Sequence, residues 1–315
     1  MEYMKNILIV LALVVVGGIG VYFVINMLTG SVSVDNNRDT VVDATDNTPG
    51  ATESDEEENT EEEEEPIDET KTVIGKSSGG KDIQAFHYGK GDTEVLFVGG
   101  IHGGYSWNTA LVAYELMDYL EENQDVIPEN VKVTVIPVLN PDGLDTVTGK
   151  QGRFEVSDVP KSESETIIGR FNGNGVDLNR NFDCDWEKTG TWQSRTVSGG
   201  DNAFSEPESE AVRAYVEGKN PAAVVVWYSA AGGVFSSSCH NGVLTETKVL
   251  TNLYAKASGY KAFEEFDFYD ITGDMVNWLA KEEIPAISVL LTSHNDIEWN
   301  KNKAGIEAVL EYYGQ

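Results

Sequence analysis

The chain has 315 residues, with 53 acidic and 22 basic side chains, and therefore a formal net charge of −31 at pH 7. This balance disfavours binding to nucleic acid and docking on anionic lipid, because both require clustered lysine and arginine. The hydrophobic fraction of 40% is sufficient for a folded core, whereas two cysteines are too few for a disulfide-rich scaffold or a thiolate zinc site.

Residues 7–28 form an uncharged and mostly apolar run near the start of the chain. A helix of this length spans about 33 Å, which matches the roughly 30 Å of hydrocarbon in a bilayer. Lys5 precedes the run and acids follow it, so the positive-inside rule places the rest of the chain outside the cytoplasm. A cleaved signal peptide is the main alternative, but its apolar region is normally shorter, and no small-x-small site follows Leu28. We expect residues 1–30 to be a single-pass signal anchor that holds the protein on a membrane.

Residues 31–70 contain sixteen acids and one base, which is a net charge of −15. This stretch has few large apolar side chains, so burial cannot offset the entropy lost on ordering, and self-repulsion extends the chain. We expect an acidic, disordered linker, with a calcium-binding or partner-binding tail as the alternative. The remaining −16 belongs to residues 71–315.

Residues 71–315 alternate between strand-like and helix-like patterns, as expected for one α/β domain. Short runs rich in Val and Ile predict strands at residues 94–100, 131–139, 222–229 and 285–292. Helical patterns cover residues 107–120, 205–217, 244–258, 274–281 and 296–313. In the second of these, we expect Ser205 to cap the helix and Pro207 to lie in its first turn. Strands of this kind, separated by helices, predict a sheet that is covered on both faces.

Four segments carry residues suited to chemistry: GGIHGGYSWNT at 99–109, LNPDG at 139–143, GVDLNRNFDCDW at 175–186 and YDITGDMVNW at 269–278. In this order and spacing they resemble the zinc carboxypeptidase family, and the resemblance extends over residues 80–315. GVDLNRNF is the most specific of the four, whereas NPDG alone is also an ordinary turn sequence. The resemblance implies an α/β fold with a mixed, mostly parallel sheet and helices on both faces.

The resemblance also implies a mechanism. In this family a His and a Glu after one strand and a second His after a later strand hold a zinc ion, while a separate Glu acts as general base. An Arg next to an Asn grips the terminal carboxylate of the substrate through the planar fork of the guanidinium group.

Several family positions are retained in this chain. His102 stands where the first zinc ligand is expected, and Asn179 and Arg180 match the carboxylate clamp. Arg170 matches the arginine that stabilises the oxyanion, with Arg153 as the alternative.

Tyr269, four residues before Gly273, matches the mobile tyrosine that covers the bound substrate. Val276 occupies the approximate specificity position and hints at ligands with an apolar C-terminal residue.

Three family positions are changed. The Glu ligand is replaced by Ser106, or by Tyr105 if strict His-x-x-Glu spacing is applied. The second His is replaced by Tyr228, and the general base by Leu290. A serine hydroxyl and a phenol are poor zinc ligands at neutral pH, and a leucine cannot accept a proton.

These changes predict a membrane-anchored protein without hydrolytic activity that needs no cofactor and still binds the C-terminal carboxylates of peptides or proteins. Two alternatives remain open: an active zinc metallocarboxypeptidase with an unconventional ligand set, and a structural module on the cell surface. His87, His240 and His294 are the other histidines, and His294 with Asp296 and Glu298 forms at most a weak cation site.

The resemblance places Cys184 and Cys239 near the rim of the site. In an extracytoplasmic domain these two cysteines are expected to form a disulfide, with two buried free thiols as the alternative.

Overall fold

A computed structural model describes residues 70–315 of the chain, which fall within one unit spanning Glu64–Gln315. The predicted membrane anchor at 7–28 and the acidic linker, apart from its last residue, lie outside the described residues. Within residues 70–315, no helix is both long and apolar enough to cross a membrane.

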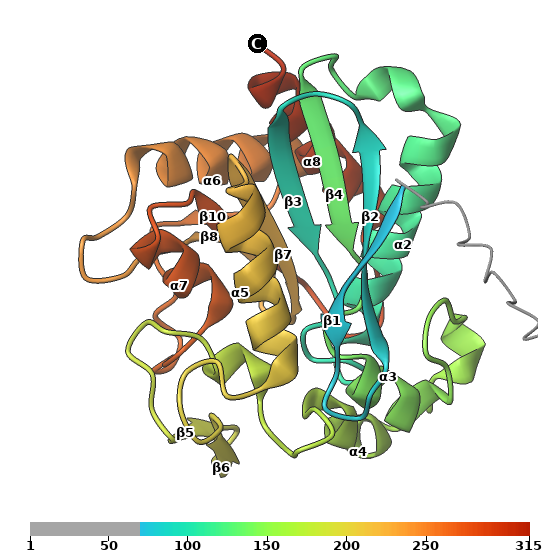
Figure 1. The fold of residues 1–315 in the computed structure, drawn as a ribbon, viewed down its shortest axis with the longest axis vertical. Helices are drawn as coiled ribbons and strands as arrows, with labels where there is room; N and C mark the ends of the chain where they lie inside the picture. The colour runs from blue at the N-terminus through green and yellow to red at the C-terminus, as the bar shows by residue number, and fades with distance from the viewer. Residues whose placement is uncertain (1–69) are drawn as a thin grey trace, which may run out of the picture. The chain divides into compact units, whose positions relative to one another are not determined.

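A mixed sheet forms the centre of the domain (Figure 1). Within the described residues it has eight strands in the order β1-β2-β4-β3-β7-β10-β8-β9. The four central strands are parallel, β1, β2 and β4 pair in antiparallel fashion at one side, and β8 runs antiparallel to β10 at the other. The strand bounds are β1 Lys71–Lys76, β2 Asp82–Gly89, β3 Thr93–Val98, β4 Val131–Ile136, β7 Ala223–Ser229, β8 Gly233–Ser236, β9 Ala262–Phe263 and β10 Ala286–Leu291.

The four predicted strands are the four central ones, β3, β4, β7 and β10. They are fully or almost fully buried, which is why their sequences read as continuous runs of Val, Ile and Leu. The outer strands were not predicted, because they are short or partly exposed and carry no such run. The expected mixed, mostly parallel α/β sheet is confirmed.

Five helices correspond to the predicted helical segments: α2 Trp107–Glu122, α5 Pro207–Lys219, α6 Thr245–Ser258, α7 Met275–Lys281 and α8 Trp299–Tyr313. Pro207 lies in the first turn of α5 as predicted, but Glu206 rather than Ser205 occupies the N-cap position. The last helix begins at Trp299 rather than 296, since its N-cap residue Glu298 has a left-handed backbone conformation with a φ of 46°.

One helix was missed because its first residues read as a turn. Pro141 of the LNPDG segment begins α3 Pro141–Thr148, and the Asn140 side chain caps it by accepting a hydrogen bond from the Gly143 amide at 2.8 Å. The shorter elements are α4 Glu163–Thr166, the 3₁₀ turns η1 Gln124–Val126, η2 Val156–Asp158, η3 Ile167–Arg170 and η4 Leu178–Arg180, and a separate hairpin of β5 Thr189–Trp192 and β6 Arg195–Ser198.

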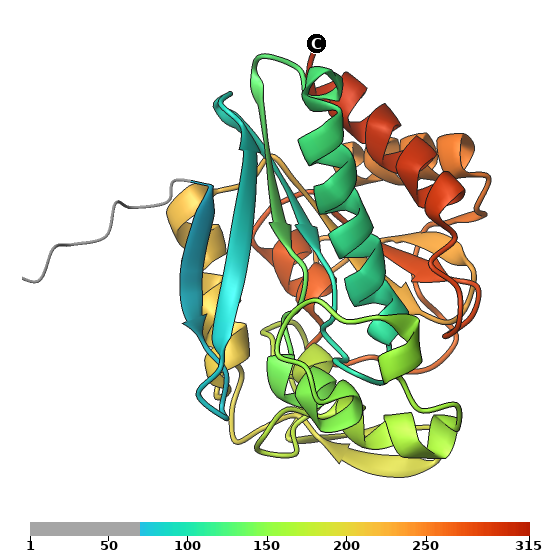
Figure 2. The same cartoon turned by 90° about the vertical axis from the view of Figure 1, so that its right-hand side faces the viewer.

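Helices cover both faces of the sheet (Figure 2). One hydrophobic core joins the sheet to α2, α6 and α8, and a second joins it to α5 and α7. Because successive strand residues point to opposite faces, Trp227 lies in the first core, and its neighbour Tyr228 lies in the second. Leu290 of β10 faces the same side as Tyr228 and is its register partner. This alternation places the two side chains next to each other at the carboxyl ends of their strands.

The cysteines are paired as predicted: Cys184 and Cys239 form a disulfide. The bridge closes a loop of 55 residues that contains the β5–β6 hairpin, α5 and β7. Such a cross-link restricts the unfolded chain more than the folded one.

Replacing both cysteines by serine is expected to lower the free energy of unfolding by about 4 kcal/mol, as loop-closure entropy predicts for a loop of this size. Urea unfolding followed by tryptophan fluorescence measures the change, with reductant-treated wild type as the matched control. An unchanged unfolding midpoint would contradict this prediction.

Candidate functional site

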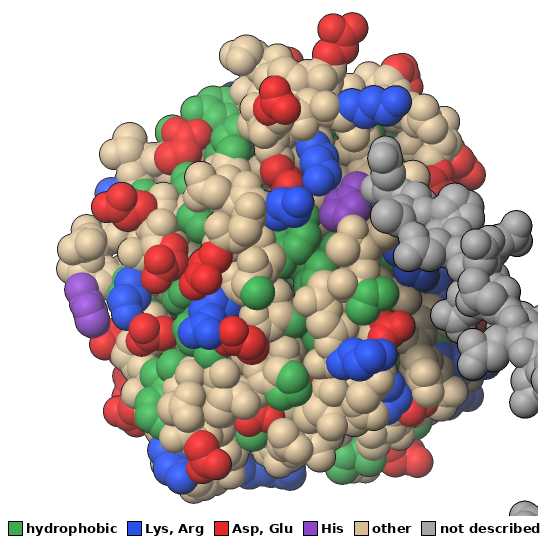
Figure 3. Space-filling model, viewed as in Figure 1, with side chains coloured by type: hydrophobic (Ala, Val, Ile, Leu, Met, Phe, Trp, Pro, Cys, Tyr) green, Lys and Arg blue, Asp and Glu red, His purple; other side chains and the backbone are tan. Residues whose placement is uncertain are grey.

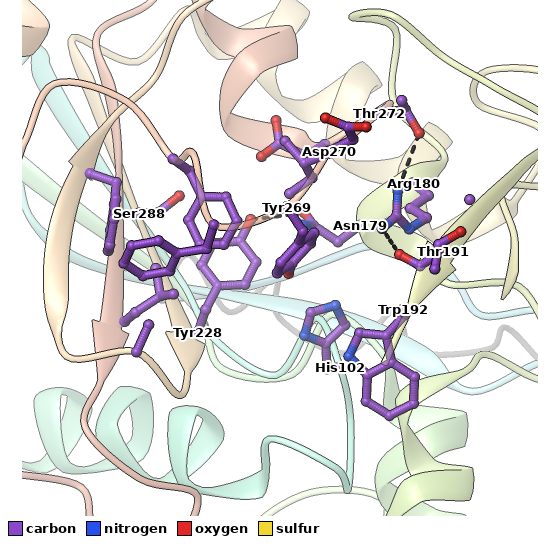
Figure 4. Close-up of a pocket in the computed structure, with 18 of the residues that line it drawn as sticks. His102, Asn179, Arg180, Thr191, Trp192, Tyr228, Tyr269, Asp270, Thr272 and Ser288 are labelled. Atoms are coloured by element: carbon purple, nitrogen blue, oxygen red, sulfur yellow. Dashed lines mark hydrogen bonds between the residues drawn. The ribbon is translucent and has the colours of Figure 1, made fainter. Parts of the chain in front are cut away.

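A pocket of about 1450 Å³ lies at the carboxyl ends of the central parallel strands, where α/β sheets commonly bind ligands. The retained family positions line it together, although they come from distant parts of the sequence (Figure 4). The predicted site residues that line the pocket are His102, Arg170, Asn179, Arg180, Tyr228, Tyr269, Val276 and Leu290, with Tyr105 and His294 beside them.

His102 lies in the loop between β3 and α2, with 4% of its surface exposed. The loop folds tightly because Gly103 has a positive φ of 42°, and a Cβ there would lie 2.6 Å from the Gly169 carbonyl oxygen. The Nε2 atom of His102 is 3.4 Å from Asp177 Oδ1. Burial first, and then the nearby Arg170 guanidinium, lowers the pKa of His102 to about 4. The imidazole is therefore neutral at physiological pH.

Tyr105 and Ser106 were the two alternatives for the changed Glu position, and the structure separates them. Tyr105 lines the pocket, with its ring centroid 4.5 Å from that of His294. Ser106 stands at the N-cap position of α2, is buried, and does not line the pocket. This geometry favours Tyr105, in place of Ser106, as the counterpart of the family's Glu.

Tyr228 and Leu290 stand at the two other positions that the resemblance implies are changed. The Tyr228 ring lies 5.9 Å from that of His102, and its hydroxyl donates to Asn179 Oδ1 at 2.9 Å. Burial, with smaller contributions from Asp274 and Tyr269, raises the pKa of Tyr228 well above 10, so that the phenol stays protonated. Leu290 contributes an apolar side chain to the lining of the same pocket.

Asp177 holds the two arginines of the site in place. It accepts hydrogen bonds from Arg170 Nε at 2.9 Å and lies 2.8 Å from Arg170 Nη2, while Arg180 Nε is 3.9 Å away. Burial disfavours the carboxylate, but the Arg170 guanidinium and the nearby His102 outweigh it and hold the pKa of Asp177 well below its usual range. Sequence reasoning assigned no role to Asp177, although it lies within the GVDLNRNF motif.

The β5–β6 hairpin covers the clamp. Arg180 Nη2 donates to the Thr191 carbonyl at 2.8 Å, and Nη1 donates to Thr272 at 3.2 Å. The ring centroid of Trp192 lies 4.4 Å from the Arg170 guanidinium carbon, and the ring packs edge-on against Tyr105. No motif marked this hairpin, because Thr191 contributes a backbone atom and Trp192 a ring face.

Tyr269 lies at the rim of the pocket and is 46% exposed, next to Phe266 at a ring distance of 4.8 Å. This position agrees with the covering role that the resemblance implies. Arg153, the alternative to Arg170, lies elsewhere and pairs with Asp118.

The other histidines do not assemble a metal site within residues 70–315. His87 is hydrogen-bonded to Thr72 and Thr134, and His240 pairs with Asp185. Glu298, which was considered together with His294, instead bonds to Thr292 and Lys301.

A family model described as zinc carboxypeptidase (Peptidase_M14) matches residues 59–296. The chain belongs to the zinc carboxypeptidase family. Among its relatives, the γ-D-glutamyl-L-diamino acid endopeptidase 1 of Lysinibacillus sphaericus is 24% identical over 217 residues, covering 63% of this chain and 54% of the relative. The carboxypeptidase N catalytic chain of Mus musculus is 30% identical over 160 residues, covering 49% of this chain and 32% of the relative. The chain thus spans about a third to a half of the length of these relatives.

Solved structures show the same fold. Bovine thrombin-activatable fibrinolysis inhibitor, in complex with tick carboxypeptidase inhibitor, gives a TM-score of 0.60 at 17% identity, covering 78% of this chain and 88% of that one. The murein-tripeptide amidase MpaA from Escherichia coli O157 gives a TM-score of 0.53 at 17% identity, covering 78% of this chain and 92% of that one. At these identities the comparison supports the fold alone.

The zinc that the family normally uses does not fit the side chains of this site. No group of three or more His, Cys, Asp or Glu residues is placed to hold a metal ion anywhere in residues 70–315. Around His102, the positions that the resemblance implies for the two other ligands hold Tyr105 and Tyr228, and the Tyr228 hydroxyl already donates a hydrogen bond to Asn179. Catalytic zinc sites use three protein ligands, and this pocket offers one histidine in that arrangement.

Asp274 is a second buried carboxyl group in the pocket that sequence reasoning missed, and it is 5% exposed. It caps α7 by accepting a hydrogen bond from the Asn277 amide at 2.8 Å. Burial raises the pKa of Asp274 to about 7, against the opposing effects of that hydrogen bond and of Arg180. A large fraction of this side chain is therefore uncharged near neutral pH.

The raised pKa of Asp274 predicts a specific pH dependence of stability. Between about pH 4 and pH 7 the folded protein binds this proton and the unfolded chain does not, so the contribution of Asp274 to wild-type stability falls as the pH rises, by at most about 1.4 kcal/mol per unit. The Asp274→Asn variant keeps a capping acceptor and lacks this loss. We expect its stability relative to wild type to increase from pH 4 to 7 and then level off.

Urea unfolding at several pH values measures this difference. The matched control is Asp125→Asn at an exposed aspartate outside the pocket. If the difference in unfolding free energy between Asp274→Asn and wild type did not change with pH, the raised pKa of Asp274 would be contradicted.

Proposed function

We propose that this domain binds the C-terminal carboxylate of a peptide or protein without hydrolysing it. The observation that carries the proposal is the contrast between the two halves of the pocket. The anion-binding half keeps Arg170, Asn179 and Arg180, whereas the positions for metal binding and proton transfer hold Tyr228 and Leu290.

The charge balance at the inner end of the pocket supports anion binding. Two guanidinium groups there share one ionised carboxylate, Asp177, and Asp274 is partly neutral near pH 7. The inner end therefore carries net positive charge in a chain whose total charge is −31. Guanidinium groups bind carboxylates through parallel hydrogen bonds that are stronger than neutral ones.

The replacements also support the absence of hydrolysis. Activation of water requires a group that accepts its proton, and Leu290 has none. His102 keeps a neutral imidazole, but no three-ligand set surrounds it in the described part of the chain. We therefore propose that no zinc cofactor is needed.

Acidic side chains on the outer wall favour ligands that also carry a cation. Glu187, Glu265, Asp267 and Asp270 line the pocket at exposed positions, opposite in charge to its inner end. A C-terminal diamino acid combines both charges, and one relative is named for γ-D-glutamyl-L-diamino acid bonds. Such peptides are the first ligand class to test, alongside the apolar residues that Val276 suggests.

We further propose that residues 7–28 anchor the protein in a membrane and that the acidic segment 31–70 separates the domain at 71–315 from it, outside the cytoplasm. The length and apolar character of the first segment and the charge of the second support this arrangement. On the face shown in Figure 3, Lys and Arg side chains are interspersed with Asp and Glu, which gives no support to nucleic acid as a partner.

The carboxylate proposal predicts that the full-length chain, in mild detergent, binds a peptide with a free C-terminus at least about tenfold more tightly than the same peptide with a C-terminal amide. Arg180→Lys keeps the charge but not the fork, and it is expected to remove most of that preference. Isothermal titration with an acetylated γ-D-glutamyl-L-lysine peptide and its amide measures both effects.

Arg153→Ala serves as the control, because Arg153 pairs with Asp118 at the surface and does not line the pocket. This variant is expected to bind like wild type. Equal affinity of wild type for the free acid and the amide would exclude the proposed function.

The second test concerns the metal. After dialysis, wild type is expected to retain negligible zinc, whereas Tyr105→Glu combined with Tyr228→His supplies the missing ligand types and is expected to retain about one zinc per chain. Elemental analysis measures the content.

The pair Ser106→Glu and Tyr228→His is the matched control, because Ser106 does not line the pocket. It is expected to hold less zinc than the Tyr105 pair. Stoichiometric zinc in wild type, with chelator-sensitive release of C-terminal residues, would instead establish an active zinc carboxypeptidase.

A further inference from the structure

The orientation of the Asn179 side-chain amide decides whether the clamp presents a hydrogen-bond donor or an acceptor to a ligand. Asn179 Oδ1 accepts hydrogen bonds from the Met275 backbone amide at 3.3 Å and from the Tyr228 hydroxyl at 2.9 Å. A backbone N–H can only donate, so the atom that faces Met275 must be the carbonyl oxygen. The amide nitrogen of Asn179 therefore points away from both partners.

That nitrogen is available to a ligand. Asn179 lines the pocket, and Nδ2 makes no hydrogen bond to any residue in 70–315. Its neighbour Arg180 lines the same inner end (Figure 4). A carboxylate bound there would meet N–H donors from both side chains.

Tyr228 is well suited to fix this orientation. It lies in β7, a central strand bonded to β3 on one side and to β10 on the other, and only 6% of its surface is exposed. Its ring packs against His102, and its register partner is Leu290, whose side chain has no acceptor to compete for the hydroxyl proton. The hydroxyl is thus held in one place with Asn179 Oδ1 as its acceptor.

We propose that Tyr228 is a positioning residue that orients the Asn179 amide so that its nitrogen faces the ligand carboxylate beside Arg180. In this inference, which rests on the proposed function, the residue at the former second-histidine position serves the clamp. Without the hydroxyl, Oδ1 keeps only the longer bond to Met275. The amide then turns more readily and presents its oxygen to the carboxylate, which repels it.

The test is Tyr228→Phe in the full-length chain, titrated with the acetylated γ-D-glutamyl-L-lysine peptide and with its C-terminal amide. Loss of one hydrogen bond is expected to weaken binding of the free acid by about five- to tenfold and to leave binding of the amide unchanged. In an Asn179→Ala background, Tyr228→Phe is expected to have no further effect on binding of the acid, because the side chain through which it acts is gone.

Tyr254→Phe is the matched control. Tyr254 is also buried and donates to an asparagine, Asn302 Oδ1, at 2.8 Å, but it belongs to the other core and does not line the pocket. It is expected to lower the melting temperature to a similar degree without changing the preference for the acid.

A general structural role would make Tyr228→Phe weaken both ligands equally, or would make its effect additive with Asn179→Ala, and either result would overturn the inference. If wild type already binds acid and amide equally, it is the proposed function that fails, which is a distinguishable outcome. Should Tyr228→Phe not fold, the Asn179 side-chain NH₂ resonances in wild type provide a second measurement. They are expected to shift with the acid and not with the amide, and unchanged resonances would overturn the inference.

Discussion

The Asp177 carboxylate is the charge on which the rest of the site depends. Two arginines and a neutral histidine are buried around it, and buried guanidinium groups are costly unless a carboxylate compensates them. One carboxylate cannot neutralise two guanidinium groups, so the cluster keeps an excess of positive charge that faces the pocket. The 3₁₀ turn Leu178–Arg180 directly after Asp177 then places Asn179 and Arg180 beside it. The single short motif GVDLNRNF thus contains the Asp177 carboxylate, the Arg180 guanidinium group near it, and both clamp residues, Asn179 and Arg180.

The sheet determines which changed residues meet. Side chains alternate along a strand, and parallel neighbours in register bring equivalent positions together, so Tyr228 and Leu290 lie side by side without any local signal in either sequence. Asn179 and Arg180 come from the loop that contains η4, whereas Tyr228 and Leu290 come from strand ends. The contacts of Arg180 with Asp177, Thr191 and Thr272 do not involve these strand residues, but Asn179 is joined to the strand through the Tyr228 hydroxyl.

Sequence patterns predicted the central strands and the long helices because burial on both faces leaves continuous apolar runs, and amphipathic helices leave a clear period. They predicted His102, Asn179, Arg180 and Tyr269 as members of the pocket because these residues lie in specific motifs. They missed the outer strands, which are short or partly exposed and carry no such run, and the helix that begins at Pro141, whose first residues also fit a turn. The predicted N-cap of α5, Ser205, was wrong by one residue, because Glu206 occupies that position directly before Pro207.

The contributions that no motif could indicate are those made through backbone atoms, ring faces and burial. The backbone carbonyl of Thr191 accepts a hydrogen bond from Arg180, and any residue at position 191 would offer the same atom. Trp192 contributes the face of its ring, which lies against the Arg170 guanidinium group. Asp274 resembles any other helix cap in sequence, yet burial in the pocket changes its charge near neutral pH. These three features bear on the same two arginines. Thr191 already binds Arg180 and Trp192 already lies against Arg170, so in the proposed function an incoming carboxylate has to add to or replace these contacts. The proposed anion binding would therefore depend on the hairpin as well as on the motif residues.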